Sequence, residues 1–375
     1  NGEIVARGGA TAERYNITLS ATGVIDPADG KEVRFDGSDI SVQWGNWIFS
    51  VNQMDRWWGP GREGSLILSN NARPMPAVSL DRGRSLPVDL PLVRLLGPWR
   101  FTGFFGLMEN ERPDVDRPVF MGMRLSFKPA PIFEFGLSRS AQFCGKGRQC
   151  NLKTLGRVLI GRDNRGRRGL PDDPNEEPGN QMAGFDVRVV SPFKPLPVAL
   201  YGQQIGEDNS STGIPERYLA LFGGEMWYML RTGSILRAHM EYANTKAKWY
   251  QSRDNFDVAY VQPIFFEGYR YHGRNIGHTT DGDSETTSLV LSLTTGEGDR
   301  WTARAWHGRL NRCCFLSYNN RISVGPSRYK AGQVSWEGDI RGFNVGIEVG
   351  YEDQKPASAG NGNGAFGFLQ VRKRL

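Results

Sequence analysis

The densest group of residues able to hold a ligand lies in residues 53–76. Four neighbours of suitable type stand together there: Asp55, Arg56, Trp57 and Trp58. Indole rings can stack on the C–H faces of a sugar while charged groups bind its hydroxyls, so the segment suits carbohydrate contact. Two other interpretations stay open, namely an aromatic anchor at a membrane–water boundary and a buried brace of arginine, aspartate and aromatic rings.

The second candidate is a charged stretch within residues 161–181. It carries in close succession Arg162, Asp163, Arg165, Arg167 and Arg168. Because guanidinium groups pair well with carboxylates and phosphates, the four arginines suit an acidic polymer if they face the cell exterior. A solvated loop and a contact with lipopolysaccharide are equally good interpretations.

Residue types for metal binding or catalysis are sparse. The four histidines show no ligand spacing such as H-E-x-x-H, and the cysteines lack a second Cys/His pair, so we predict no metal site and no cofactor. Asp55 and Glu63 could act as the carboxylate pair of a glycosidase. No local motif supports catalysis, however, and we predict that the protein is not an enzyme.

Cys144 and Cys150 bracket a short glycine-rich loop. The loop is flexible enough to allow a local disulfide bond between them. Two free thiols are the alternative interpretation. A disulfide would be a modest sign of an oxidising compartment.

Strands must position these residues, because apolar and polar side chains alternate along several segments. Residues 121–127, 236–242 and 343–352 each place apolar residues on one face and polar residues or glycine on the other. Glycine (47) and proline (21) leave little room for helices, and aromatic residues reach 11%. The pattern predicts an all-β protein, but a soluble sandwich and an outer-membrane barrel share the same period.

Unequal connections between these segments favour the barrel. Residues 295–300 form a short connection and residues 161–181 a long one, and outer-membrane barrels combine short periplasmic turns with long outer loops. No apolar run reaches the ~18–20 residues of a membrane-spanning helix. Residues 91–97 and 151–160 predict two short helices, which either pack on a neighbouring loop or fold into the lumen as part of a plug.

Several sequence blocks resemble the Wzi-like capsule-assembly family of bacterial outer-membrane proteins. The segment of residues 53–76 carries the resemblance first. Further blocks look like family blocks and stand in family order: residues 143–150, 159–164, 178–185, 197–208 and 269–278. The resemblance covers most of residues 44–283 and, more loosely, the strands after them, so it is more specific than any short motif in the chain.

The resemblance implies a fold: a single large antiparallel transmembrane β-barrel of about 18 strands over residues 1–375, with long loops and short helices plugging the lumen. Members of the family carry a helical periplasmic region ahead of the barrel. We expect that region to be absent or trimmed in this chain, because strand-like alternation begins near Tyr15.

The resemblance also implies an outer-membrane lectin that binds capsular or exopolysaccharide and helps attach or assemble it at the cell surface. The expected partners are that polysaccharide, outer-membrane lipid and lipopolysaccharide, and polysaccharide-export machinery, with no nucleic acid. The alternative is an outer-membrane channel for polysaccharide or small solutes. We expect residues 55–58 to shape the lumen or its rim, with Arg162 and Asp163 nearby.

Overall fold

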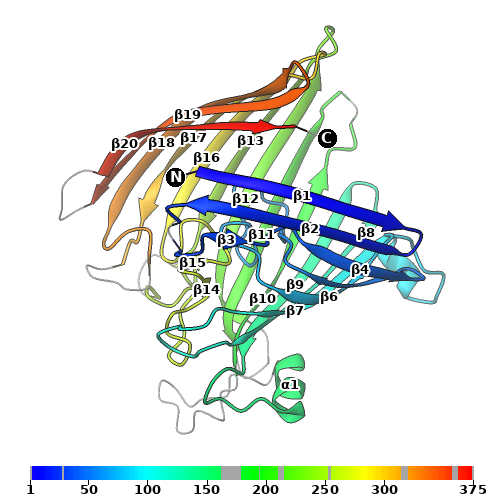
Figure 1. The fold of residues 1–375 in the computed structure, drawn as a ribbon, viewed down its shortest axis with the longest axis vertical. Coiled ribbons are helices and arrows are strands. Elements are labelled where there is room, and N and C mark those ends of the chain that lie inside the picture. The colour runs from blue at the N-terminus through cyan, green and yellow to red at the C-terminus, as the bar shows by residue number, and fades with distance from the viewer. Residues whose placement is uncertain are drawn as a thin grey trace.

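The alternating segments pair into one curved antiparallel sheet of 18 strands, seen in the computed structural model (Figure 1). The structure describes residues 2–27, 29–161, 179–193, 195–209, 215–251, 255–313, 320–356 and 362–373. The strands of this sheet are β1 (Gly2–Ala12), β2 (Tyr15–Ile25), β3 (Val33–Arg34), β4 (Asp39–Trp44), β5 (Trp47–Asn52), β6 (Ala77–Arg82), β7 (Trp99–Leu107), β8 (Val119–Ala130), β9 (Phe133–Phe143), β10 (Gly179–Val190), β11 (Val198–Asn209), β12 (Pro215–Met229), β13 (Ile235–Asn244), β16 (Glu285–Thr294), β17 (Arg300–Leu310), β18 (Ser327–Ile340), β19 (Phe343–Pro356) and β20 (Gly362–Arg372).

Most strands pair with the next one along the chain, so the sheet is a meander. β3 and β4 both pair with β2, and β13 pairs directly with β16. The strands predicted from the two-residue period are confirmed by β8, β13 and β19. The first strand begins at Gly2, not near Tyr15 as the alternation predicts, because its glycine and alanine residues conceal the pattern. The architecture is the predicted antiparallel all-β barrel.

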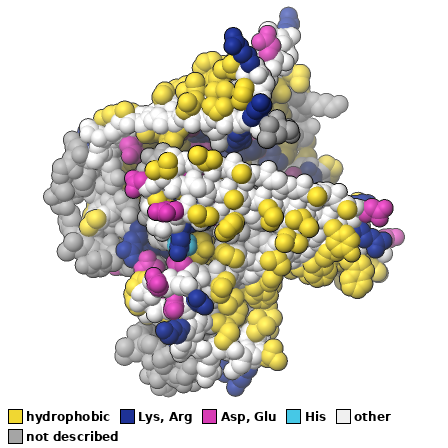
Figure 2. Space-filling view, in the orientation of Figure 1, with side chains coloured by type: hydrophobic (Ala, Val, Ile, Leu, Met, Phe, Trp, Pro, Cys, Tyr) yellow, Lys and Arg dark blue, Asp and Glu magenta, His cyan; other side chains and the backbone are white. Residues whose placement is uncertain are grey.

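The two faces of the sheet differ in polarity. Leu200 and Val349 face outward and are 67% and 58% exposed. Gln203 and Ser140 face inward and are each 1% exposed. A soluble sandwich would bury its apolar face instead, so this arrangement fits a barrel whose exterior meets hydrocarbon. Figure 2 shows hydrophobic side chains spread over the outer surface of the wall.

The two ends of the barrel have connections of different length. At one end most turns are short, as at residues 13–14, 45–46 and 341–342, and the connection of residues 83–98 is the longer one there. At the other end the connections are long, as at residues 53–76 and 245–284. Outer-membrane barrels place short turns on the periplasmic side and long loops outside, which identifies the long-loop end as the outer one.

Two of the long connections fold into the lumen, and we call them the first plug segment (residues 53–76) and the second plug segment (residues 245–284). The second contains a small hairpin of β14 (Arg270–Tyr271) and β15 (Arg274–Asn275). Both segments and the lumen-facing wall share one buried apolar cluster: Trp58, Leu66, Ile67, Leu68, Ala72, Met75, Ala77, Phe104, Met108, Phe120, Met182, Tyr201, Ile205, Leu219, Leu221, Ala243, Ala259, Tyr260, Tyr269, Tyr271 and Ile276.

Side chains satisfy the backbone groups that the plug buries. Gln203 of β11 donates to the Trp58 carbonyl at 2.7 Å and accepts from the Leu66 N–H at 2.8 Å. Tyr269 of the second plug segment donates to the Ile67 carbonyl at 2.8 Å. Because a buried backbone group without a partner is costly, these bonds fix the plug in one position.

The described helices lie outside the lumen. The 3₁₀ helix η1 (Val93–Leu96) stands in the connection from β6 to β7 and has no buried residue. The helix α1 (Leu152–Leu159) follows the cap residue Asn151 and packs on the wall. Both match the predicted short helices, but the expectation that these helices plug the lumen is wrong, since extended segments of the long connections fill it instead. Within the described ranges, no helix combines the length and apolarity needed to cross a membrane.

Candidate functional site

A cavity of about 440 Å³ lies between the plug and the wall formed by β13 and β16–β19. Its volume falls within the ~300–1,000 Å³ typical of small-molecule sites. Leu310, the last residue of β17, and Gln354 near the end of β19 line it, so the cavity belongs to the long-loop half of the barrel.

The strand register arranges the wall side of the cavity in two rows. The first row consists of Glu241, Ser288, Trp306, Ala331 and Glu352. The second row consists of Ala243, Thr286, Gly308, Tyr329 and Gln354. Because paired residues lie opposite each other and alternate residues share a face, Trp306 and Tyr329 are diagonal neighbours. Both rings line the cavity.

Glu63 and His278 close the cavity from the plug side. The Glu63 N–H donates to the Glu241 carboxylate at 3.1 Å, and the Glu63 carboxylate lies 3.2 Å from His239 Nε2. The His278 ring lies against Gly64, where a Cβ atom would come within 2.3 Å of His278 Nε2. Glycine at this position therefore lets the imidazole reach the cavity wall.

Carboxylates dominate the charge of the cavity. Its described lining includes Glu63, Glu241 and Glu352 but neither lysine nor arginine. Arg304 lies just outside, with its Nε 3.8 Å from the Glu63 carboxylate. Burial lowers the pKa of His278 to about 4, so this imidazole is neutral at pH 7. The net charge of the cavity lining is therefore negative, and Arg304 offsets only part of it.

This arrangement suits a polyhydroxylated ring. The Trp306 indole offers a flat apolar surface, and carboxylates such as Glu63 and Glu352 can accept hydrogen bonds from hydroxyls. Threonine and serine side chains of the lining add groups that both donate and accept. The charge favours a neutral sugar or an amino sugar over an acidic one, because a carboxylated ligand would meet like charges.

The residues predicted from the aromatic signature are brought together in the first plug segment, but in a packed environment. Trp58 is 4% exposed and meets the Phe104 ring edge-on at 5.7 Å. The Arg56 guanidinium lies 4.2 Å from the centre of the same ring. Trp57 donates its indole N–H to a plug carbonyl at 2.9 Å. Asp55 is their neighbour at a small cavity.

That small cavity has a volume of about 20 Å³. A single water molecule needs about 10–15 Å³ by a comparable measure, so the space beside Asp55 and Arg56 suits one water and no sugar. Of the three interpretations of this segment, the geometry favours the buried brace. Asp55 and Glu63, the carboxylates considered for a glycosidase, line different cavities.

The remaining predicted residues divide into two groups. Cys144 and Cys150 form a disulfide bond, as their flexible loop allows. The charged residues of the second candidate lie outside the described residues: Arg162, Asp163, Arg165, Arg167 and Arg168.

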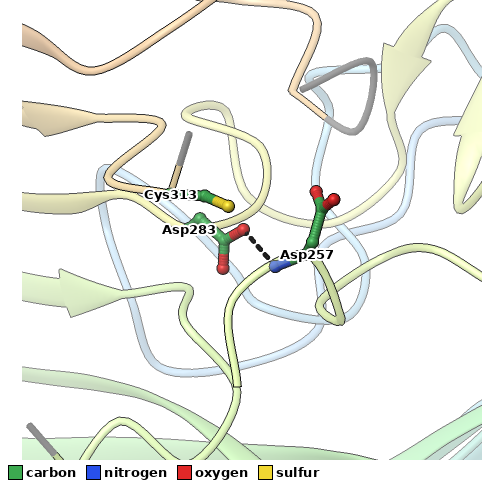
Figure 3. A group of neighbouring side chains, drawn as sticks. All are labelled: Asp257, Asp283 and Cys313. Atoms are coloured by element: carbon green, nitrogen blue, oxygen red, sulfur yellow. Dashed lines mark hydrogen bonds between the residues drawn. The ribbon is translucent and has the colours of Figure 1, made fainter. Parts of the chain in front are cut away.

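A group of metal-ligand residue types lies at the edge of the second plug segment (Figure 3). Ligand-type atoms of Asp257, Asp283 and Cys313 lie within 4.8 Å of one another. Cys313 is disulfide-bonded and has no thiolate to offer. Asp283 accepts a hydrogen bond from the Asp257 N–H at 2.6 Å, and burial raises the pKa of its carboxyl to about 7. The group fits a structural contact better than a metal centre.

Sequence reasoning missed the residues of the larger cavity. One signal was available: Trp306 shares the polar face of β17 with Arg304, whereas Trp301 lies on the outward face. A tryptophan on the lumen-facing side of a strand is the pattern that could have identified it. The plug side offers no such signal, because Glu63 meets Glu241 across 178 positions of the chain.

Comparison with known proteins adds an independent line of support. Residues 4–356 match the family model described as capsule assembly protein Wzi. An uncharacterized 55.8 kDa protein in the cps region of Klebsiella pneumoniae is 29% identical over 322 residues. The alignment covers 84% of this chain, which spans about 59% of the length of that relative.

A solved structure matches the fold closely. It is that of Wzi from Escherichia coli, described as an outer membrane protein involved in group 1 capsule assembly and as a carbohydrate-binding β-barrel. The two proteins are 25% identical and superpose with a TM-score of 0.83, over 99% of this chain and 79% of the other. The likeness therefore extends through the wall and the plug.

Proposed function

This chain belongs to the capsule assembly protein Wzi family, and we propose that it is an outer-membrane lectin that binds capsular or exopolysaccharide and helps attach or assemble it at the cell surface. The protein lies in the bacterial outer membrane. The observation that carries the proposal is the cavity beside Trp306, in the long-loop half of the barrel, which faces the outer side.

We propose that the cavity holds one sugar unit of the polymer, with its apolar face on Trp306 and its hydroxyls near Glu63 and Glu352. The negative lining favours a neutral sugar or an amino sugar at this place. One such contact is weak, but a polymer that engages many copies of the protein is held by avidity. Export machinery remains a predicted partner that no contact in the structure addresses.

Residues 55–58 have a supporting role in this proposal. The Trp58 ring and the Arg56 guanidinium pack against Phe104 and hold the first plug segment against the wall. This keeps Glu63, five positions beyond Trp58, at the edge of the cavity. The basic residues of positions 162–168 remain candidates for acidic units of the polymer.

A channel and a glycosidase are the alternatives. The plug segments fill part of the lumen, so we expect low conductance in planar bilayers, and a large steady conductance would support the channel. The Asp55 and Glu63 carboxylates line different cavities, so we expect no cleavage. New reducing ends after incubation with purified capsule would contradict this expectation.

The proposal is tested by comparing two tryptophans of the same strand. Trp306→Ala removes the ring that lines the cavity, and Trp301→Ala removes an outward ring that is 49% exposed. Both variants should fold to barrels with the same mobility shift on heating. Binding of purified capsular polysaccharide in detergent should fall at least fivefold for Trp306→Ala only. Equal binding by both variants would contradict a sugar site in the cavity.

A further inference from the structure

The helix α1 is attached to the outer surface of the barrel wall. Its Val158 belongs to a buried cluster with Met121 of β8 and Ala141 of β9. These wall residues face outward, because their strand neighbours Phe120 and Ser140 contact the plug inside the lumen. Ala141 stands two residues before the end of β9, which corresponds to roughly 7 Å along the strand. The helix therefore lies outside the barrel, close to the long-loop rim.

The apolar face of the helix is wider than its contact with the wall. Leu155 and Val158 pack on the wall. Leu152 and Leu159 share one side of the helix with Leu155 but are 87% and 42% exposed. Ile160, the cap residue that follows, is 65% exposed. These three side chains form an exposed stripe that continues the packed face, and a helix gains nothing from such a stripe unless another apolar phase meets it.

A polar contact fixes the C-terminal end of α1 to the wall. Arg139 of β9 donates to the Leu159 carbonyl at 2.8 Å and also to the Val158 carbonyl. Its guanidinium bonds Gln181 of β10 at 2.7 Å. Arg139 shares the outward face with Ala141, and a charge on that face is tolerated near the interface far better than at mid-membrane. Carbonyls at a helix end suit a cation. This end of α1 therefore lies at headgroup depth.

We propose that α1 lies in the outer leaflet and binds lipopolysaccharide. Its exposed stripe contacts acyl chains, and Lys153 and Arg157, four residues apart on an adjacent side, pair with the phosphates. Continuity with the apolar exterior of the wall and the basic charge of the helix single out this occupant. The proposal rests on the outer-membrane location and is independent of sugar binding in the lumen.

A spin label at position 152 tests the depth of the helix. Leu152→Cys is placed in lipopolysaccharide-containing bilayers, with the unlabelled parent protein as background. Leu137→Cys, on the outward face of β9, marks the hydrocarbon, and Glu13→Cys, in a short turn, marks water. We expect the label at position 152 to collide more often with oxygen than with a water-soluble nickel chelate, as at position 137. Accessibility like that of position 13 would overturn the proposal.

Charge reversal tests the phosphate contact. The double variant Lys153→Glu with Arg157→Glu should shift the label at position 152 toward water in lipopolysaccharide bilayers. It should also lower the amount of lipopolysaccharide that copurifies with the protein by at least threefold. In phosphatidylcholine bilayers the same change should have a smaller effect, because no lipid A phosphates are present. An unshifted label and unchanged copurification would overturn lipopolysaccharide recognition. The polysaccharide-binding assay on the same variant should stay unchanged, which separates this proposal from the lectin function.

Discussion

Two regions of the molecule combine tryptophan with charged side chains and use them differently. In the first plug segment, Trp58 is 4% exposed and its ring is in contact with Phe104. On β17, Trp306 faces a cavity of about 440 Å³. The residue types are the same, and the space beside each ring differs. Binding capacity therefore depends on what the neighbouring side chains leave open.

The difference follows from the origin of each region. The first plug segment enters the lumen as a loop and must satisfy its backbone, which Gln203 and other side chains accomplish at short range. Its aromatic rings complete that packing. The wall at Trp306 has its backbone bonds within the sheet already, and the ring lines an open cavity. A regular strand can therefore present a ring to a ligand at little structural cost.

Removing the Trp58 ring and the Trp306 ring in turn tests this comparison most directly. Trp58→Ala should destabilise the protein by about 3–5 kcal/mol, since a buried ring is lost and a hole remains. Trp306→Ala should cost less than about 1 kcal/mol, because its ring borders an open cavity and is not enclosed by the core. Urea unfolding of detergent-solubilised protein, followed by near-ultraviolet circular dichroism, measures both. Similar losses for the two variants would show that the two rings do not differ in role.

A second test asks whether the plug alone responds to pH. Burial raises the pKa of Asp283 to about 7 and lowers that of His278 to about 4, both in the second plug segment. The protonated Asp283 contributes stability that is complete below its ordinary pKa of 3.8 and lost as the pH rises to about 7. The neutral His278 contributes stability that is complete above its ordinary pKa of 6.5 and lost as the pH falls to about 4.

The two contributions oppose each other between about pH 4 and 6.5, so single variants separate them. In His278→Gln only the Asp283 contribution remains, so the free energy of unfolding should fall as the pH rises toward 7. In Asp283→Asn only the His278 contribution remains, so the free energy of unfolding should fall as the pH drops toward 4. The slope in each case is at most about 1.4 kcal/mol per pH unit. Urea midpoints at four pH values measure it, and Glu13→Gln in an exposed turn is the control. Parallel profiles for all variants would contradict the assignment.

The smallest effect concerns the charge of the wall. Glu352→Gln removes one carboxylate from the cavity without changing its shape. Binding of an acidic oligosaccharide should improve two- to fivefold, or about 0.4–1 kcal/mol, as expected for a partly screened charge. Binding of a neutral oligosaccharide should change little. Titration calorimetry with both ligands measures this, and equal shifts would mean that the negative lining does not select by charge.

The fold could be predicted from sequence because its signal is local. Alternation along residues 343–352 needs no distant partner to be recognised, and it became β19 with apolar residues outward. The cap at Asn151 and the leucines after it likewise predicted α1. The position of α1 on the exterior could not be predicted, since it depends on Arg139 and Ala141, which reach the helix through the tertiary fold.

The site could be predicted only as a class of chemistry. Aromatic rings beside charges suggested sugar binding, and the structure supports that chemistry at Trp306 while residues 55–58 are packed. The cavity joins Glu63, Trp306 and Tyr329, which come from one loop and two strands. Which ring remains open depends on volumes contributed by residues far apart in the chain, and no short pattern records such volumes.

The bond between the Glu63 N–H and the Glu241 carboxylate has a consequence for biogenesis. Each hairpin of the wall can close early, because its partners are adjacent in the chain, whereas this contact spans 178 residues and must wait until β13 has been made. The cavity beside Trp306 is therefore complete only after the first plug segment has made this contact. A nascent or misassembled molecule therefore lacks the cavity, so any ligand that the cavity takes is bound only by the fully folded barrel.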